Sequence, residues 1–509
     1  MSQSPFLIEL AALVRAGAAD HAWTLFVGAG LGTSDDPAVL TLKGRILKAR
    51  ARAAEGAARA ALYGEAAAAY LAAAPGGGGA YALINAATLS LLAGDEAAAR
   101  VHALAVLQVD DDDAPYYRAA TRAEALLLLR RFDEAWAALD AAVAVAPKAW
   151  EDHAVTLRQF RLLLGALGRD DAALARLAPP RALHFTGHMA VAPDGAGLAA
   201  KVARLVAEER IAFGYGALAA GADIVIAEAL ADAGVELHVL LPLDPAVFRT
   251  LSVMPWGEAW GARFDRLLAR ADSVRVVTPG ATKIDASTID LAAETAMGLA
   301  VLKAATLAGE AVQWAVVGGD EAGASARAGA RWTAGGRRRR VLSAPRRTTG
   351  LVAPNDPTVR LAAFLGCAVD LPDSAEREAV LRTLAHAVEG GPFTITAPSW
   401  SGRTLLLIYE TPDDAAQAAR RMLAALGERV RLAGSYGPTA LAPDPFGRGR
   451  LATGAEADAV ARLLVTAPPG AIHLGVAFAA ALCVATPLNR PLPVTDLTGD
   501  ELGPYALRP

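Results

Sequence analysis

Cysteine is scarce in this chain of 509 residues. Cys367 and Cys483 are its two cysteines, and each stands inside an apolar run. So few thiols argue against a disulfide framework or a cysteine-based zinc site, and they are typical of a reducing compartment. We therefore expect a cytoplasmic protein in which both cysteines are small residues of the core.

Three common catalytic motifs are missing as well. The sequence contains no Gly-x-x-x-x-Gly-Lys-Ser/Thr phosphate loop, no His-Glu-x-x-His zinc motif, and no Gly-x-Ser-x-Gly nucleophile elbow with a paired base. Its eight histidines show no spacing typical of metal ligands. The sequence thus predicts no metal site and no catalytic residue of these classes.

The sequence also lacks a strong net charge and shows no pattern typical of a secretory or membrane segment. The net charge of −4 gives no general attraction for nucleic acid or acidic membranes. The N-terminus lacks a basic region, and Glu9 interrupts its apolar run, which argues against a signal peptide. The longest weakly polar stretch, residues 471–488, contains His473 and Pro487 and is at the short limit for a membrane span. We predict that this stretch is buried core, and we expect neither nucleic acid nor membrane as a partner.

The composition is that of a globular, alanine-rich protein, with 54% hydrophobic and 20% charged residues. At about 150 residues per domain, the length predicts three or four domains. We predict helical repeats in residues 1–178, an α/β domain in 179–318, a linker in 319–357 and an α+β domain in 358–509.

The first third shows a self-similar helix-turn-helix pattern. Its landmarks are a turn rich in Gly, Arg, Asp or Glu followed by a helix with small inner residues, at residues 63–70, 93–99, 131–137 and 168–172. The spacing of roughly 30–38 residues resembles that of tetratricopeptide repeats. The resemblance implies an all-α superhelix with a concave groove that binds a protein or peptide. A scaffold that only separates other domains is the alternative.

Strands and helices alternate in the predicted α/β domain. The expected strands are residues 183–186, 211–213, 235–241, 273–277 and 312–317, and the expected helices are 198–208, 222–233, 256–271 and 288–308. This alternation predicts a doubly wound, Rossmann-like parallel sheet covered on both faces. Residues 319–357 break the pattern with a run of four arginines, 337–340, followed by Arg346 and Arg347. We interpret them as a solvated linker; contact of the basic run with phosphates is the alternative.

Glycines follow the first two strands of this domain, where helix N-termini meet the carboxyl ends of parallel strands and form an anion pocket. The segment Gly216-Ala-Leu-Ala-Ala-Gly-Ala-Asp223 resembles the Gly-x-x-x-Gly-Ala-Asp turn of the SLOG superfamily, Rossmann-like proteins that bind nucleotides or nucleotide-derived ligands. The Pro-Gly-Gly-x-Gly-Thr motif of its Lonely-Guy-type members is incomplete at residues 278–282, so hydrolysis of a ribotide is not implied. Glycines that only make tight turns, and a solvent-exposed Glu228, are the alternatives. The predicted ligand-binding residues are Thr186, Gly187, Gly214, Gly216, Gly221, Asp223 and Glu228.

The last third has four landmarks, at residues 361–365, 405–409, 454–462 and 468–478. Together they resemble a class III nucleotidyl cyclase domain, which implies an α+β, ferredoxin-like fold. Such enzymes hold two metal ions with two aspartates, and the alignment places Ala368 and Arg403 at these positions. Asp458 replaces the ribose-positioning asparagine, whereas Arg462 matches the transition-state arginine. The resemblance therefore implies a domain without catalytic residues, unless Asp370 serves as a ligand after a small shift of register.

The order of these parts resembles bacterial multidomain signalling proteins. We expect a regulatory protein that binds a nucleotide or nucleotide-derived ligand in its centre and a partner protein through its repeats. The C-terminal domain would form a homodimer, because class III cyclase domains build their sites between two chains. An active adenylate or guanylate cyclase is one alternative, and a nucleotide-processing enzyme acting through Asp223 or Glu228 is another. No further cofactor is indicated.

Overall fold

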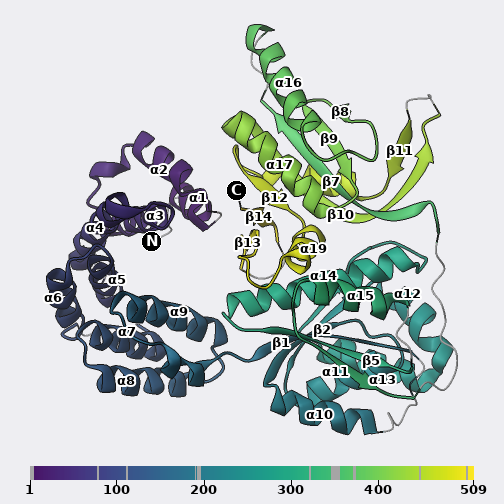
Figure 1. Cartoon of the computed structure of the whole chain (residues 1–509), viewed down its shortest axis with the longest axis horizontal. Helices are drawn as coiled ribbons and strands as arrows, with labels where there is room; N and C mark the ends of the chain where they lie inside the picture. The colour runs from purple at the N-terminus through teal and green to yellow at the C-terminus, as the bar shows by residue number, and fades with distance from the viewer. Residues whose placement is uncertain are drawn as a thin grey trace. The chain divides into compact units, whose positions relative to one another are not determined.

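The computed structural model describes residues 5–15, 17–76, 79–109, 113–189, 191, 197–319, 323–345, 356–370, 374–445, 449–499 and 503–508. The chain divides into two compact units, the N-terminal unit Met1–Pro179 and the C-terminal unit Pro180–Pro509 (Figure 1). The predicted fold class is confirmed, since a helical region, a parallel α/β domain and a mixed α+β domain follow one another along the chain.

The described part of the N-terminal unit is helical. Its elements are α1 Pro5–Arg15, α2 Ala19–Gly28, η1 Leu31–Thr33, α3 Pro37–Ala53, α4 Gly56–Ala73, η2 Ala74–Gly76, α5 Gly79–Leu92, α6 Glu96–Val106, α7 Pro115–Leu128, α8 Phe132–Val145, α9 Trp150–Ala166 and η3 Ala172–Leu177. Consecutive helices pack on one another through buried alanine and leucine, because small side chains let helices approach closely.

Two of the expected repeat landmarks are wrong in detail. Residues 63–70 do not form a turn but lie inside α4, where the surrounding alanines favour a continuous helix over a break at Gly64. The landmark at residues 168–172 leads into the short 3₁₀ helix η3 and not into an α-helix. The turns before α6 and α8 lie where the sequence predicted them.

The α/β domain occupies the first half of the C-terminal unit. Its elements are β1 Arg181–Gly187, α10 Leu198–Glu208, β2 Ile211–Gly216, α11 Ala222–Asp232, β3 Glu236–Leu241, α12 Pro245–Phe248, η5 Arg249–Val253, η6 Met254–Trp256, α13 Glu258–Arg270, β4 Ser273–Val276, α14 Ala286–Thr306, β5 Ala311–Val317, α15 Gly323–Ala334 and β6 Arg339–Ser343. All of the strands and helices predicted here from the alternation are present.

The six strands form one parallel sheet in the order β4-β3-β2-β1-β5-β6. The chain moves outward from β1 to β4 and then returns to the other side of β1, so the order reverses between β1 and β5. Helices α10, α11 and α13 cover one face of the sheet, and α14 covers the other. In open α/β sheets, ligands bind at the carboxyl ends of the strands beside such a reversal.

The predicted linker is wrong for its first part, because α15 and β6 belong to the α/β domain. The strand β6 pairs with β5, and Trp332 of α15 is fully buried. Arg338 and Arg340 both form ion pairs with the buried carboxylate of Glu209, at 2.9 and 2.6 Å. The arginine run therefore neutralises a core carboxylate, a long-range contact that composition could not predict. Residues 346–355 of the expected linker lie outside the described residues.

The second half of the C-terminal unit is an α+β domain. Its elements are β7 Val359–Val369, α16 Ser374–Glu389, β8 Ser399–Ser401, β9 Thr404–Tyr409, α17 Pro412–Leu426, η7 Gly427–Arg429, β10 Val430–Pro443, β11 Arg450–Thr453, α18 Glu456–Thr466, β12 Ile472–Leu474, α19 Val476–Ala485, β13 Val494–Asp496 and β14 Tyr505–Leu507. The sheet has the order β13-β14-β12-β10-β7-β9-β8, and β11 pairs with β10.

The helices of this domain cover both faces of its sheet. A Cβ at Gly366 would meet Val460 of α18, whereas a Cβ at Gly434 would meet Phe478 of α19 on the other face. Cys367 and Cys483 are buried, as predicted, and burial raises the pKa of each thiol to about 12. The stretch predicted as buried core contains α19, and no helix among the described residues has the length and apolar character to cross a membrane.

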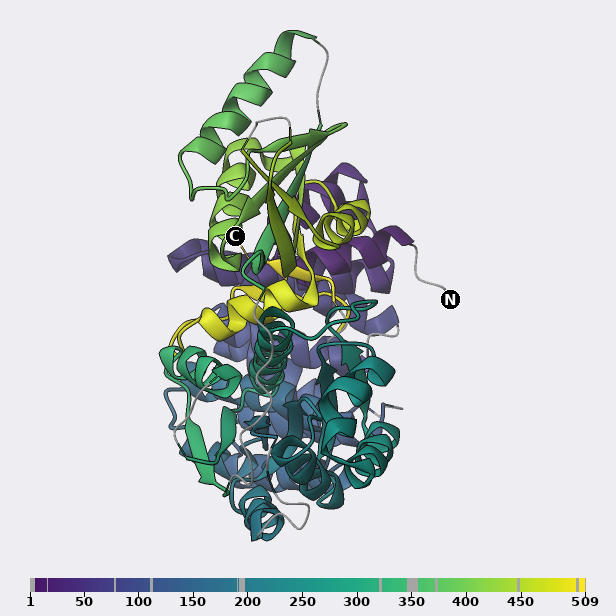
Figure 2. The same cartoon turned by 90° about the vertical axis from the view of Figure 1, so that its right-hand side faces the viewer.

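Helix α14 joins the two domains of the C-terminal unit. One side packs on the parallel sheet, and the other packs on α19, which is drawn in yellow directly against α14 (Figures 1 and 2). A Cβ at Gly298 would lie 2.3 Å from the Cα and the carbonyl oxygen of Ala480, so the helices touch at backbone distance. Arg337 donates to the carbonyl oxygens of Cys483, Val484 and Thr486 at 2.6–2.8 Å and so caps the carboxyl end of α19.

We predict that Gly298→Ala destabilises the C-terminal unit, because the added methyl group forces α14 and α19 apart. Overpacking of this kind costs about 1–3 kcal/mol. Scanning calorimetry of the full chain should show a lowered Tm. Gly64→Ala on α4 is the matched control: no atom lies within 4 Å of its added Cβ, and alanine there should stabilise by about 0.5–1 kcal/mol. An unchanged Tm for Gly298→Ala would contradict the close crossing.

Candidate functional site

A cavity of about 1540 Å³ lies at the carboxyl end of β1, within the C-terminal unit. The α/β domain lines it with residues of β1, α11, α14 and α15, and the α+β domain lines it with residues of α17, β10 and α19. It is larger than the roughly 300–1,000 Å³ that encloses a drug-sized ligand. Because β1 is the strand at which the strand order reverses, the cavity lies at the position where doubly wound sheets commonly bind ligands.

Asp223 in the first turn of α11 lines this cavity and is only 6% exposed. The backbone amides of Ala219 and Gly187 donate to its carboxyl group, whereas Oδ1 is buried with no hydrogen-bond partner. Burial raises the pKa of Asp223 to about 8, and the two amide hydrogen bonds only partly oppose this shift. A buried carboxyl oxygen without a partner costs about 1–3 kcal/mol, which a ligand hydroxyl group would recover.

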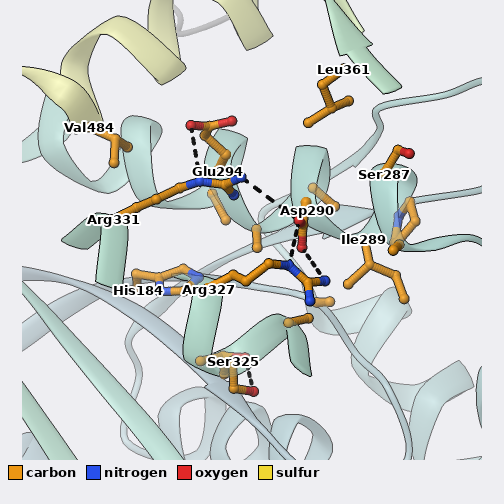
Figure 3. Close-up of a pocket in the computed structure, with 18 of the residues that line it drawn as sticks. His184, Ser287, Ile289, Asp290, Glu294, Ser325, Arg327, Arg331, Leu361 and Val484 are labelled. Atoms are coloured by element: carbon orange, nitrogen blue, oxygen red, sulfur yellow. Dashed lines mark hydrogen bonds and ion pairs between the residues drawn. The ribbon is translucent and has the colours of Figure 1, made fainter. Parts of the chain in front are cut away.

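Another part of the lining carries two carboxylates on α14 and two arginines on α15, each pair at i and i+4 spacing (Figure 3). Arg327 of α15 donates to Asp290 of α14 through two hydrogen bonds, at 2.7 and 2.8 Å. Arg331 lies 3.8 Å from Asp290 and 3.9 Å from Glu294, and its Nη1 is buried without a partner. Tyr436 of β10 donates to Glu294 at 3.3 Å. Burial raises the pKa of Glu294, so this part of the lining links both domains through a carboxyl group that resists ionisation.

Hydroxyl groups and helix N-termini complete the cavity beside β1. The hydroxyl groups of Thr186 and Ser325 lie 3.5 Å apart, the second in the first turn of α15. The first turns of α14 and α17 also line the cavity, through Ser287 and Asp413. The N-terminal end of a helix carries a partial positive charge, which favours an anionic group nearby.

Three of the predicted ligand-binding residues line the cavity together, namely Thr186, Gly187 and Asp223. The other three glycines lie outside its lining and are explained by packing. A Cβ at Gly214 would meet Leu230, one at Gly216 would meet Phe185, and one at Gly221 would meet the carbonyl oxygens of His188 and Met189. Gly221 also has a φ of 112°, which a residue with a side chain rarely adopts.

Glu228 does not line the cavity. Its two carboxylate oxygens accept hydrogen bonds from Arg263 of α13, at 2.9 and 2.5 Å. The residue is five positions after Asp223 on α11, and the helix turns it toward α13 and away from the strand ends. The ion pair of Glu228 with Arg263 therefore holds α11 against α13.

The expected cyclase positions are also located by the structure. Ala368 on β7 packs against the core under α18, and Arg403 is exposed in the turn between β8 and β9. Arg403 Nη1 lies 4.0 Å from Asp370 Oδ1. Asp458 and Arg462 are exposed on α18. Within the described ranges, no group of three His, Cys, Asp or Glu side chains is arranged to hold a metal ion.

Comparison with known proteins gives structural similarities for the C-terminal third. No family model matches the sequence, and no curated protein matches it. A double mutant of the guanylyl cyclase domain of the RhoGC fusion protein from the fungus Blastocladiella emersonii matches 29% of this chain and 93% of its own, with 12% identity and a TM-score of 0.23. The adenylyl cyclase CyaB from P. aeruginosa matches 24% of this chain and 81% of its own, with 10% identity and a TM-score of 0.20.

The guanylate cyclase domain of RhGC from Catenaria anguillulae, solved in complex with GTP, matches 29% of this chain and 95% of its own, with 14% identity and a TM-score of 0.21. These similarities concern the fold of a part of the chain, and the chemistry of this chain is argued from its own residues. We refer to residues 356–508 as the cyclase-like domain.

Sequence reasoning missed the charged part of the cavity lining. It did not single out Asp290, Glu294, Arg327, Arg331 or Tyr436. A signal was present, since Asp290 and Glu294 interrupt an apolar helix at i and i+4, and Arg327 and Arg331 repeat that spacing on the next helix. The assignment of residues 319–357 to a linker concealed this match.

The raised pKa of Asp223 predicts a specific dependence of stability on pH. The Asp223 carboxyl group holds its proton more tightly in the folded protein than in the unfolded chain. Protonation of Asp223 therefore stabilises the fold fully below about pH 4, and this stabilisation is lost as the pH rises to about 8. Relative to Asp223→Asn, the free energy of unfolding of the parent chain should fall by up to about 1.4 kcal/mol per pH unit in this window.

Urea unfolding of both proteins at several pH values measures this difference. Asp232→Asn is the control, because Asp232 is exposed at the other end of α11. Parallel pH profiles for the parent chain and Asp223→Asn would contradict the assigned environment of Asp223.

Proposed function

We propose that this protein is a regulator that binds a nucleotide-type ligand in the cavity at the carboxyl end of β1. The observation that carries the proposal is the buried Oδ1 of Asp223, which lacks a partner at the wall of a large cavity beside the strand reversal. A hydroxyl group of a ribose would donate to this oxygen. Two hydroxyl-bearing side chains, Thr186 and Ser325, lie at the same end of β1 and extend the polar surface.

The cyclase-like domain, in this proposal, has no catalytic role. Cyclisation of a nucleoside triphosphate needs two metal ions held by carboxylates. Ala368 offers no ligand atom, and the cation Arg403 lies beside Asp370, the one carboxylate that a register shift would bring forward. The domain instead supplies part of the cavity wall and, in a homodimer, a paired surface.

The N-terminal unit is proposed to bind a partner protein or peptide. A row of polar side chains connects α3, α5, α7 and α9: Lys48 donates to Asn85, while Thr88 and Gln159 donate to Glu124. Burial lowers the pKa of Lys48 and raises that of Glu124. Such a row on consecutive repeats suits the polar backbone of an extended peptide, which would exchange hydrogen bonds with it.

Ligand binding should depend on Asp223 in its ionised form. We expect one ribonucleoside in a panel of four to raise the Tm of the full chain. The affinity for this ribonucleoside should increase between about pH 6 and about pH 8, because Asp223 loses its proton in this range. Asp223→Asn should bind roughly 10-fold to 100-fold more weakly, with no such pH dependence, since it loses a hydrogen bond to a charged group. Calorimetric titration measures both effects.

Glu228→Gln is the matched control, because it makes the same chemical change on the same helix outside the cavity. It should leave the affinity unchanged. Binding that is equal in Asp223→Asn and the parent chain would refute the role of Asp223, and no binding by any nucleoside or nucleotide would refute the proposal itself.

We also predict that the purified protein forms no cyclic nucleotide from ATP or GTP with Mg²⁺ or Mn²⁺, because the metal carboxylates are replaced. Chromatography of the reaction products is the measurement. The alternative is that Asp370 holds a metal ion after a small shift of register. Formation of cyclic nucleotide that is abolished in Asp370→Ala and retained in Asp496→Ala would establish this alternative.

A further inference from the structure

The charge of the cavity lining limits the ligands that fit it. Among the described residues, five carboxyl groups line the cavity but only two guanidinium groups. Arg327 is engaged, since it binds Asp290 through two hydrogen bonds, and Arg331 faces Asp290 and Glu294 at 3.8 and 3.9 Å. Burial raises the pKa of Asp223 and of Glu294. The negative charge that a polyphosphate chain would meet is therefore that of Asp290, Glu410 and Asp413.

The cyclase-like domain contributes to this negative charge. Glu410 and Asp413 flank the first turn of α17, line the cavity and are exposed. Asp413 accepts a hydrogen bond from the uncharged Gln417, so no described cation neutralises it at hydrogen-bond distance. We call Asp290, Glu410 and Asp413 the acidic wall.

The end of the cavity near β1 has features that favour one anionic group. The first turn of α15 presents its N-terminal end and the hydroxyl group of Ser325 to the cavity, and Arg327 lies two positions further along the same helix. Asp223, with its buried and unpartnered Oδ1, lies at the other side of β1, because Gly187 donates to it while the preceding Thr186 faces Ser325. The site thus pairs a hydroxyl-binding carboxyl group with a single anion-binding turn.

We infer that the acidic wall selects a nucleoside or nucleoside monophosphate over a nucleoside triphosphate, and that the cyclase-like domain sets this preference through Glu410 and Asp413. The inference rests on the proposed nucleotide-type ligand. Like charges about 10 Å apart in a partly screened site repel enough to weaken binding roughly 3-fold to 10-fold for each added phosphate. The domain that resembles a triphosphate-converting enzyme would then exclude triphosphates from the neighbouring site.

The test is a titration series on the full chain in the presence of EDTA. Adenosine, AMP, ADP and ATP, or the equivalent series of the base that binds best, are titrated by calorimetry. We expect adenosine and AMP to bind within about 3-fold of each other and ATP to bind roughly 10-fold to 100-fold more weakly than AMP.

The double variant Glu410→Gln/Asp413→Asn should reduce the difference between AMP and ATP roughly 3-fold to 10-fold. It keeps Thr411, which caps α17 by accepting from the amide of Asp414, so the helix should still form. Glu376→Gln/Glu378→Gln on α16 is the control, because these exposed carboxylates lie outside the cavity lining.

The outcomes separate this inference from the proposed function. ATP that binds as tightly as adenosine overturns the inference and leaves the ligand site in place. A preference for AMP that the double variant does not alter overturns the role of Glu410 and Asp413. If no member of any series binds, the proposed function fails, and the inference fails with it.

Discussion

The backbone contact between Gly298 and Ala480 is the constraint on which the C-terminal unit depends. It allows α14 to serve two hydrophobic cores at once, that of the parallel sheet and that of the cyclase-like domain. Arg337 fixes the same junction from the other end of α19 by binding three carbonyl oxygens. With α14 held in this way, its residues Asp290 and Glu294 line a cavity whose walls belong to both domains.

The cavity combines features that oppose stability. Asp223 has a buried oxygen without a partner, Arg331 has a buried Nη1 without a partner, and Glu294 is a carboxyl group whose ionisation burial disfavours. Unsatisfied polar groups of this kind are rare in protein interiors, and they gather at sites where another molecule completes the hydrogen bonds. In our proposal, ligand binding accounts for their concentration at this cavity.

In our proposal the cyclase-like domain keeps a fold without a catalytic role. The resemblance implies metal positions at Ala368 and Arg403 and a transition-state arginine at Arg462. In our proposal its remaining contribution is electrostatic and structural, because Glu410 and Asp413 line the neighbouring cavity and Tyr436 donates to Glu294. Ligand occupancy would then be sensed by both domains without any reaction.

The sequence by itself determined the order of the three parts and, in the α/β domain, five strands and four helices. Alternating apolar runs located β1 to β5 and the helices between them, because the hydrophobic period is a local property, and the segment after β2 contains Asp223, which lines the cavity. Only the tertiary structure decided the rest. Gly216 and Gly221 lie where an added Cβ would meet neighbouring atoms, and Glu228 forms an ion pair with Arg263. The end of the arginine run begins strand β6, and Arg338 and Arg340 form ion pairs with Glu209. Each of these depends on a partner far away in the chain, and such partners are chosen by the packing of helices and sheets and not by local pattern.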